Sequence, residues 1–395
     1  MTRARAFTAA LFALVVVALV VAPVAGAEPL RLRANALATA ESPAGLMTLE
    51  ASGQGRPWLA AEALVWMGAE PDLDGNALVV ALVARDPDRR AQARVGRFVA
   101  SPGAVRPTHI DGASGRAALP WGDVHAEAFG GVPVLSGAGG RAYSWIAGGR
   151  VSRSLGRWGS AGVGYMQRRE RGRLYDEELA LDAGGAATSD LDLAVRGAYD
   201  LSTPGISEAR GLAAWRRGDY RVSGFAIHRS PSRLLPATSL FSVLGDAPSQ
   251  RVGGEVSWRA APRLDVVGVA AGSYVARELG ADLELRGTLR LDPRGRGAVS
   301  LGLRRQNARI ADYTGLRATG RFPVHPKFWL TSELEVAVPD ESRGRGRVWP
   351  WGLVALRWDP DSPWQAAIAV ESSASPQHRA RADALLRVSR AWEEP

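Results

Sequence analysis

The chain is 395 residues long, contains no cysteine and carries a formal net charge of +9 at pH 7. Without cysteine it can have no disulfide framework, no thiolate metal site and no thiol nucleophile. Its basic residues stand singly rather than in runs, and all but one are arginine, as in a GC-rich genome, so they argue against a nucleic-acid-binding patch.

Residues 1–27 are predicted to be a secretory signal peptide. Arg3 and Arg5 precede an apolar run, Ala9 to Val21, which is followed by a small-residue cleavage site at Ala25-Gly26-Ala27. The run is shorter than the ~20 residues that a membrane-spanning helix needs, which disfavours the alternative of a transmembrane anchor. Removal of the two arginines would leave a mature net charge of +7.

Alternation of apolar and polar residues predicts strands along the rest of the chain. Residues 28–121 are expected to hold two to four strands, the best being Pro57 to Met67 and Asn76 to Asp86. Sixteen more are predicted, at residues 122–130, 141–151, 157–168, 172–182, 189–200, 206–216, 219–229, 250–259, 263–275, 279–291, 297–305, 309–322, 326–338, 347–358, 363–372 and 379–392.

The clearest alternation is in Ala281 to Asp292, "ADLELRGTLRLD". Because side chains of a strand point to opposite faces in turn, Leu283 and Leu285 share an apolar face, and Glu284 and Arg286 share a charged one. In a soluble sandwich the apolar face would meet a core. In an outer-membrane barrel it would meet lipid, and the charges would meet a water-filled lumen.

Strand length favours the barrel. The good alternations run nine to twelve residues, whereas soluble strands average ~5–6 and tilted transmembrane strands need ~9–11. We therefore predict an all-β fold in which residues 28–395 form one transmembrane antiparallel up-and-down β-barrel of about 18 strands, in the range 16 to 20. Short connections alternate with longer ones such as 231–250 and 339–347, which predicts short periplasmic turns and longer external loops.

Particular residues are expected at particular places in such a barrel. An aromatic girdle at the headgroups is predicted from tryptophans near strand ends, namely Trp258, Trp349, Trp351, Trp358, Trp364 and Trp392. The predicted pore-lining residues are Arg196, Arg251, Arg259, Glu284, Arg286, Arg290, Glu333 and Glu335. The long segment 99–121 is expected to fold inward and narrow the pore, with Arg106, His109 and Asp111 at the constriction. The alternative is that the charges pair with one another and fill a closed interior.

The sequence holds no pattern typical of an enzyme. It lacks a phosphate loop, a complete dinucleotide-binding glycine motif and a G-x-S-x-G elbow, and its five histidines show no paired metal-ligand spacing. A dyad of His125 or His228 with a serine such as Ser144 or Ser223 has no local motif behind it. We predict no enzymatic activity, no catalytic residue, no metal and no cofactor.

Arg94 to Val134 resembles a region of porin-like outer-membrane barrels in which a Gly-Arg strand leads through an Asp-Gly turn into the next strand. Gly96-Arg97, Asp111-Gly112 and the Phe129-to-Pro133 ending carry the resemblance. The chain is also similar to a poorly characterised group from myxobacteria-like Gram-negative organisms. The resemblance implies contact with the bilayer and lipopolysaccharide of the outer membrane, and insertion by the barrel-assembly machinery. The chain departs from the usual aromatic C-terminus because three residues follow Trp392.

The expected function is passive or weakly selective diffusion of small polar solutes, with a mild preference for anions from the arginine-lined face. A first alternative is export of a secreted polysaccharide, which would involve a periplasmic partner. A second alternative is a plugged structural or surface barrel. The sequence does not distinguish the substrate or the oligomeric state.

Overall fold

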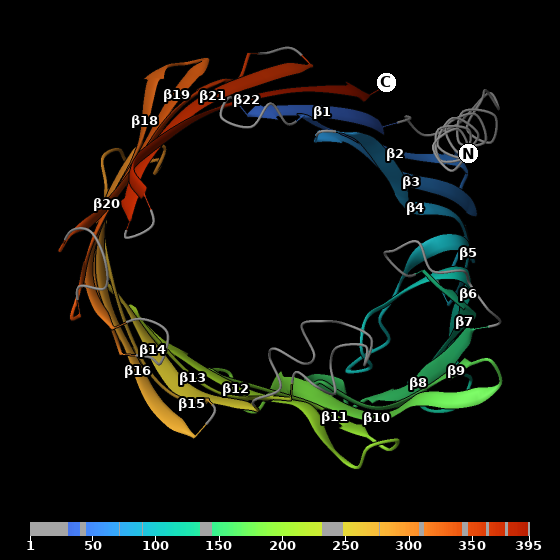
Figure 1. Ribbon diagram of the computed structural model, residues 1–395. Coiled ribbons are helices and arrows are strands. Elements are labelled where there is room, and N and C mark those ends of the chain that lie inside the picture. Colours follow the sequence, from blue (N-terminus) through green and yellow to red (C-terminus); the bar gives the residue numbers. More distant parts are fainter. Residues whose placement is uncertain are drawn as a thin grey trace.

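The computed structural model describes residues 31–39, 45–70, 72–88, 90–134, 144–230, 248–275, 277–307, 312–341, 347–360, 363–375 and 378–393. The expected signal peptide, residues 1–27, lies outside them. No helix in these ranges is long and apolar enough to cross a membrane. The described chain forms one sheet that closes on itself as a ring of strands (Figure 1).

Each strand pairs antiparallel with its neighbours in the sequence, and the last strand pairs with the first. The closing ladder runs from Arg31 opposite Glu393 to Thr39 opposite Leu385. The strands are β1 (Arg31–Thr39), β2 (Gly45–Arg56), β3 (Leu59–Glu70), β4 (Asp72–Arg85), β5 (Ala91–Ala100), β6 (Thr108–Ala118), β7 (Val124–Pro133), β8 (Trp145–Ser154), β9 (Ser160–Glu170), β10 (Arg173–Ala186), β11 (Leu191–Asp200), β12 (Gly205–Arg217), β13 (Tyr220–Arg229), β14 (Ser249–Ala261), β15 (Leu264–Val275), β16 (Glu278–Arg290), β17 (Ala298–Asn307), β18 (Tyr313–His325), β19 (Phe328–Pro339), β20 (Trp349–Trp358), β21 (Trp364–Ser375) and β22 (His378–Glu393), with a 3-10 turn, η1, at Gly156–Trp158.

The barrel has 22 strands, not about 18. All sixteen strands predicted from residue 122 onward are present, as β7 to β22. The error lies before residue 122, where the structure has six strands instead of two to four. There the connections on either side of β3 are only one or two residues long, as at Pro57-Trp58 between β2 and β3, and alanines weaken the contrast between the two faces.

The two faces of the sheet differ in chemistry. On β16, Leu283 and Leu285 are exposed by 50 % and 57 % on one face, and Glu284 and Arg286 lie on the other. Residues that pair across neighbouring strands lie on the same face. Followed from strand to strand, the pairing places the charged residues of β16 on the face of Ala180, which packs inside the ring. The leucine face is therefore the outer one, as a barrel in lipid requires.

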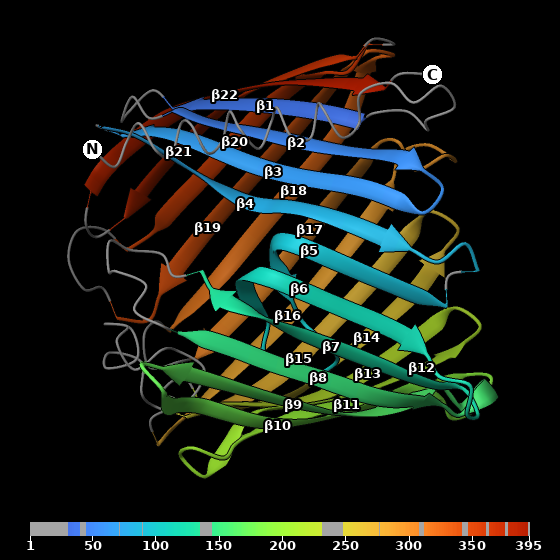
Figure 2. The ribbon, with the colours of Figure 1, turned by 90° about the vertical axis from the view of Figure 1, so that its right-hand side faces the viewer.

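The two ends of the barrel also differ (Figure 2). The end at which Arg31 lies opposite Glu393, the first and last described residues, has short turns such as 262–263 and 326–327, whereas the connections 230–248 and 340–348 join strands at the other end. We call these the terminus end and the loop end. Most exposed tryptophans of the described ranges lie at the terminus end, namely Trp58, Trp121, Trp158, Trp215, Trp258, Trp358 and Trp364, and Trp145 lies at the loop end. This arrangement matches an interfacial aromatic girdle.

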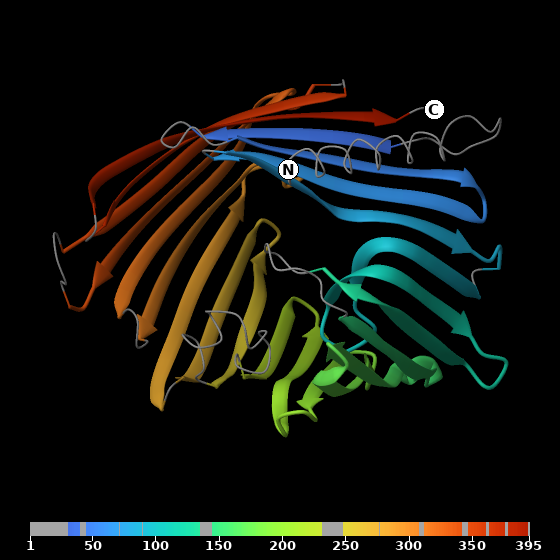
Figure 3. The same ribbon diagram turned by 45° about the vertical axis from the view of Figure 1, so that its right-hand side comes forward.

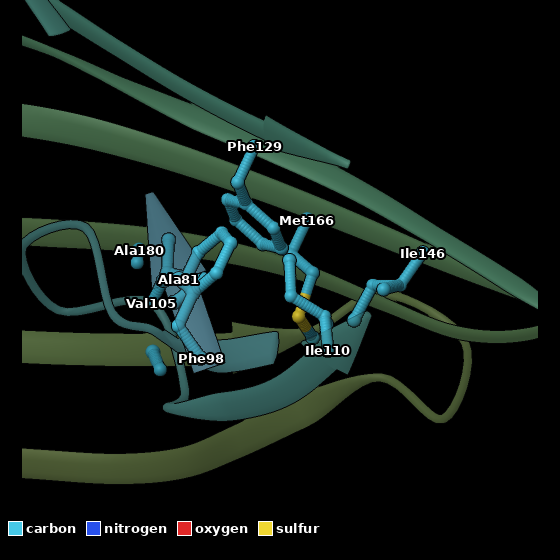
Figure 4. Packing of buried hydrophobic residues seen from close by; sticks show 10 residues of the cluster. Ala81, Phe98, Val105, Ile110, Phe129, Ile146, Met166 and Ala180 are labelled. Carbon is cyan, nitrogen blue, oxygen red and sulfur yellow. The ribbon is translucent and has the colours of Figure 1, made fainter. Parts of the chain in front are cut away.

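One described stretch leaves the wall and enters the ring. Residues 101–107, between β5 and β6, fold back over the inner faces of β7 to β11 (Figures 1 and 3). Buried apolar side chains of both sides meet there, among them Phe98, Ile110 and Met166 (Figure 4). Full burial of such a side chain contributes about 1.5–3 kcal/mol, which holds the stretch against the wall.

Candidate functional site

The inner wall of β11 to β19 brings together the eight residues predicted to line a pore. All of them lie on the inward face by register, because each alternates with an outward apolar neighbour. Three of the arginines keep much of their side-chain surface accessible, with exposed fractions of 46 % for Arg196, 46 % for Arg251 and 49 % for Arg286. The space in front of this wall is therefore not filled by the described part of the protein.

Opposite charges alternate along the wall, and every one of the eight residues has an ionic partner. Arg196 pairs with Glu208 at 2.9 Å and Arg251 pairs with Asp282 at 3.2 Å. Asp265 is shared by Arg259, at 3.8 Å, and Arg290. Arg317, which the sequence analysis did not single out, bridges Glu333 and Glu335. Most of the wall's positive charge is therefore paired with carboxylates, which weakens the anion preference expected from net charge alone.

Arg286 and Arg259 are the most loosely held of these arginines, each with its ionic partner 3.8 Å away. The ionic contact of Arg286 is to Glu284 at 3.8 Å, beyond hydrogen-bonding distance. It borders a recess of about 370 Å³ in the inner wall, whose lining includes the small residues Gly302 and Gly315 and the hydroxyl of Thr319. Because Gly302 lies between Arg286 and Arg317 in the register, the missing side chain leaves room between two guanidinium groups.

The inward stretch 101–107 is fixed to the wall by ionic contacts. The backbone N–H of Arg106 donates to Glu178 at 2.9 Å, and its guanidinium lies 3.2 Å from both Glu178 and Asp176. Glu178 is fully buried by this contact. Farther along the same surface, Gly103 lies against Arg150, whose guanidinium binds the carboxylate of Asp182 through two nitrogens.

The structure separates the three predicted constriction residues. Arg106 lies in the inward stretch as expected, whereas His109 and Asp111 belong to β6. Asp111 accepts two hydrogen bonds from Arg97, at 2.6 and 2.9 Å, and His109 contacts the backbone oxygen of Leu78 at 2.7 Å. Asp111 alternates with the inward Ile110, so it faces outward. The expected inward segment, 99–121, is thus shortened to 101–107, because β6 already begins at residue 108.

The predicted girdle needs a correction at two positions. Trp258, Trp358 and Trp364 lie on the outer face at the terminus end. Trp349 and Trp351 lie at the loop end of β20, on the inner face: Trp351 is opposite Glu335 in the register, and its indole N–H donates to Glu371 at 2.6 Å. Closeness to a strand end predicts a girdle position for Trp349 and Trp351, but it does not predict whether the side chain lies on the inner or the outer face. The side chain of Trp392 lies outside the described part of the chain.

Several residues of this wall were missed from sequence. Asp176, Glu178 and Asp182 lie two or four residues apart in β10, with Leu179 and Leu181 on the other face. The sequence therefore indicates that the three acids share a face, but their partners are distant in the chain. Arg106 and Glu178 are separated by 72 residues, and Arg150 and Asp182 by 32. No local signal pairs them. The tryptophans at 58, 121, 158 and 215 were also missed, because each lies at a turn or a weak strand end.

No protein-family model matches the chain. No curated protein matches it in sequence. Solved structures do match in fold: an iron transporter, FrpB, from Neisseria meningitidis has a TM-score of 0.55 at 9% identity, over 95% of this chain and 83% of its own. A copper transporter, OprC, has a TM-score of 0.55 at 10% identity, over 92% and 80%. The translocation pore of the P pilus usher, PapC, has 0.51 at 9% identity, over 92% and 99%.

These likenesses identify the class of fold, a large closed antiparallel β-barrel of the outer-membrane type. An outer-membrane location agrees with this fold, with the outward leucine face and with the tryptophans at one end. At identities near 10%, the likeness concerns the fold and not the activity. The myxobacteria-like origin stays a prediction.

Proposed function

We propose that the protein is an outer-membrane channel for passive or weakly selective diffusion of small polar solutes, with a mild preference for anions. One observation carries the proposal: arginines of the inner wall keep about half of their side-chain surface exposed inside a closed barrel, with 49 % for Arg286 and 56 % for Arg317. Charges that filled a closed interior would be buried. The terminus end, which has the short turns, would face the periplasm. The outer face would contact lipid and lipopolysaccharide after insertion by the assembly machinery.

The expected selectivity is weak because acids and arginines alternate on the wall. Among the wall arginines, Arg286 and Arg259 are available to passing anions, since the nearest carboxylate of each lies 3.8 Å away. Rings of charged side chains set the selectivity of aqueous pores, so a surplus of free guanidinium would favour anions.

Planar-bilayer recording tests both parts of the proposal. An open pore gives steady conductance, and its reversal potential in a salt gradient reports selectivity. Replacing both Arg286 and Arg290 by Glu should move the reversal potential toward that of a cation-selective pore. The matched control replaces Arg294 and Arg296, which carry the same charges in the exposed turn 291–297, off the wall. Absence of conductance contradicts the channel, and equal shifts in the two variants contradict the assignment of the selective wall.

Export of a polysaccharide is a second candidate, favoured by the width of the barrel. Barrel diameter grows with strand number, and 22 strands enclose a wider lumen than the 18 first expected. An exporter that awaits a periplasmic partner should conduct poorly on its own. Neighbouring glycosyltransferase genes would favour export over diffusion.

A further inference from the structure

The wall is interrupted between β4 and β5 at the loop end. Their ladder has six paired positions, from Val80 opposite Arg97 to Arg85 opposite Gln92, whereas each other pair of neighbouring strands has eight or more in the described ranges. β4 continues for eight more residues, 72–79, without a described strand on this side. An open strand edge in the hydrocarbon region leaves backbone N–H and C=O groups without hydrogen bonds. Other groups must therefore satisfy this part of β4.

Three glycines in register explain how β5 leaves β4. Gly96 of β5 lies opposite Gly112 of β6, which lies opposite Gly131 of β7. A Cβ on Gly96 would overlap the carbonyl oxygen of Val80, and one on Gly112 or Gly131 would overlap the backbone of the adjoining strand. Gly96 also has φ 129°, a conformation that favours glycine. This row of glycines lets the strands approach closely and turn inward together (Figure 2).

Side chains take the place of the missing ladder. Nη1 of Arg97 donates to the backbone oxygen of Ala77 at 3.2 Å and to Oδ1 of Asn76 at 2.9 Å. Nε2 of His109 bonds the backbone oxygen of Leu78 at 2.7 Å. We call these three bonds the latch. They join β4 to the bent hairpin through exchangeable side-chain contacts rather than through a continuous backbone ladder.

Behind the latch, the interior is apolar, unlike the charged wall of β11 to β19. Val79 packs against the buried cluster that contains Phe98, Ile110 and Phe129. In front of the latch, Leu78 and Val99 are exposed by 40 % and 50 % toward the lipid side. A path through the interruption would therefore be apolar at both ends, with the polar latch between them.

We propose that this interruption is a closed lateral port through which a single-chain amphiphile with an anionic head passes between the lumen and the loop-end half of the bilayer. The apolar surfaces on both sides accommodate the chain. The head would compete for Nη1 of Arg97, the guanidinium nitrogen that does not bind Asp111, since charge-assisted bonds to a carboxylate are stronger than bonds to a backbone carbonyl. Loss of the Arg97 bonds leaves the His109 bond alone to close this part of the edge, so the interruption can widen. This activity is separate from diffusion along the barrel axis.

Labelling from the bilayer tests the port, and the cysteine-free sequence makes single-cysteine variants unambiguous. Ile110→Cys places a thiol at a fully buried position behind the latch. In proteoliposomes, the membrane-dissolved reagent N-(1-pyrenyl)maleimide should label it slowly, and at least about ten-fold faster when Arg97→Gln weakens the latch, because hydrogen bonds of a charged donor are strong. Laurate below its micellar concentration should protect the thiol, and glucose should not.

Two controls separate opening of the port from general loosening. Arg94→Gln removes the neighbouring arginine of β5, which pairs with Glu62 and takes no part in the latch, and it should leave the labelling rate unchanged. Ala271→Cys, buried on the inner face where β14 and β15 are fully paired, should resist the bilayer reagent. If Ile110→Cys impairs folding, judged by heat-modifiable gel migration, Val105→Cys probes the same cluster.

The proposal is overturned if Arg97→Gln does not accelerate labelling from the bilayer, or if laurate gives no protection. It is also overturned if a water-soluble thiol reagent is accelerated to the same extent, since the barrel has then loosened as a whole. Conductance along the axis is measured separately, so loss of the port leaves the proposed channel standing, and the reverse also holds.

Discussion

Replacement of Leu285 by arginine should destabilise the barrel by about 2–4 kcal/mol, because it places a charge at mid-height on the lipid face. Leu285 lies five residues before Arg290, the end of β16, and is 57 % exposed on the outer face. Five residues at ~3.3 Å each, tilted by about 40°, rise about 12 Å, which is half of the ~25 Å apolar band. The midplane penalty therefore applies.

Two companion substitutions on the same strand calibrate the effect. Leu279, also outward, lies one residue from the start of β16 and is 81 % exposed, so arginine there should cost only about 0–1 kcal/mol near the interface. Arg286→Leu, one position from Leu285 on the inner face, removes a loose ion pair that should be worth at most ~1 kcal/mol.

The free energy of unfolding can be measured by urea titration in lipid vesicles, with tryptophan fluorescence as the signal and heat-modifiable migration as the test of folding. Leu285→Arg should lower the free energy of unfolding most, and Leu279→Arg and Arg286→Leu should lower it much less. Equal costs at Leu285 and Arg286 would show that the two faces are wrongly assigned. Equal costs at Leu285 and Leu279 would show that the apolar band does not lie where the strand geometry places it.

Three further outcomes are expected. Glu178→Gln removes the buried charge that holds the inward stretch 101–107, and single-channel currents should become larger and noisier; unchanged, quiet currents would mean that the stretch does not narrow the lumen. Gly112→Val cannot be accommodated against the backbone of Gly130, so folded barrel should be lost on a gel, and normal yield would argue against the close approach of the strands. Backbone N–H groups of its turn hold the pKa of Asp292 below its ordinary value, so its stabilising effect is present above the unfolded pKa, ~3.9, and lost as pH falls through the folded pKa. Asp292→Asn should abolish that part of the acid sensitivity in unfolding titrations, and an unaltered pH profile would contradict it.

Much of the fold was predictable because one physical rule governs most strands. From residue 122 onward, most strands alternate outward apolar side chains with inward ones, and on β11 to β19 many of the inward ones are polar or charged. The rule fails where the contrast is weak. In β3, Ala60, Ala61 and Ala63 fall on both faces, and in β5 the glycine Gly96 breaks the alternation. The strand count was therefore too low in this region only.

The face on which each wall residue lies was predictable from the sequence, and its ion-pair partner was not. Period-two alternation assigns Glu284 and Arg286 to one face whatever their neighbours are. Partnership depends on register between strands and on how a connection folds back, as for Arg106 on Glu178, and neither leaves a local trace in the sequence. Gly96, Gly112 and Gly131 illustrate the limit: each is visible in the sequence, but their alignment appears only when β5, β6 and β7 are paired.

The ladder between β1 and β22 makes closure of the barrel depend on pairing of the first described strand with the last. Arg387 donates to Asn35 across 352 residues of sequence, so this closure joins the two ends of the described chain. Until the final strand arrives, the growing sheet has two free edges, and each could recruit a strand from another chain. A high sequence separation also makes closure entropically slow. A chain that lacked β22 would therefore remain an open, aggregation-prone sheet, because the free edge of β1 would have no partner within the described chain.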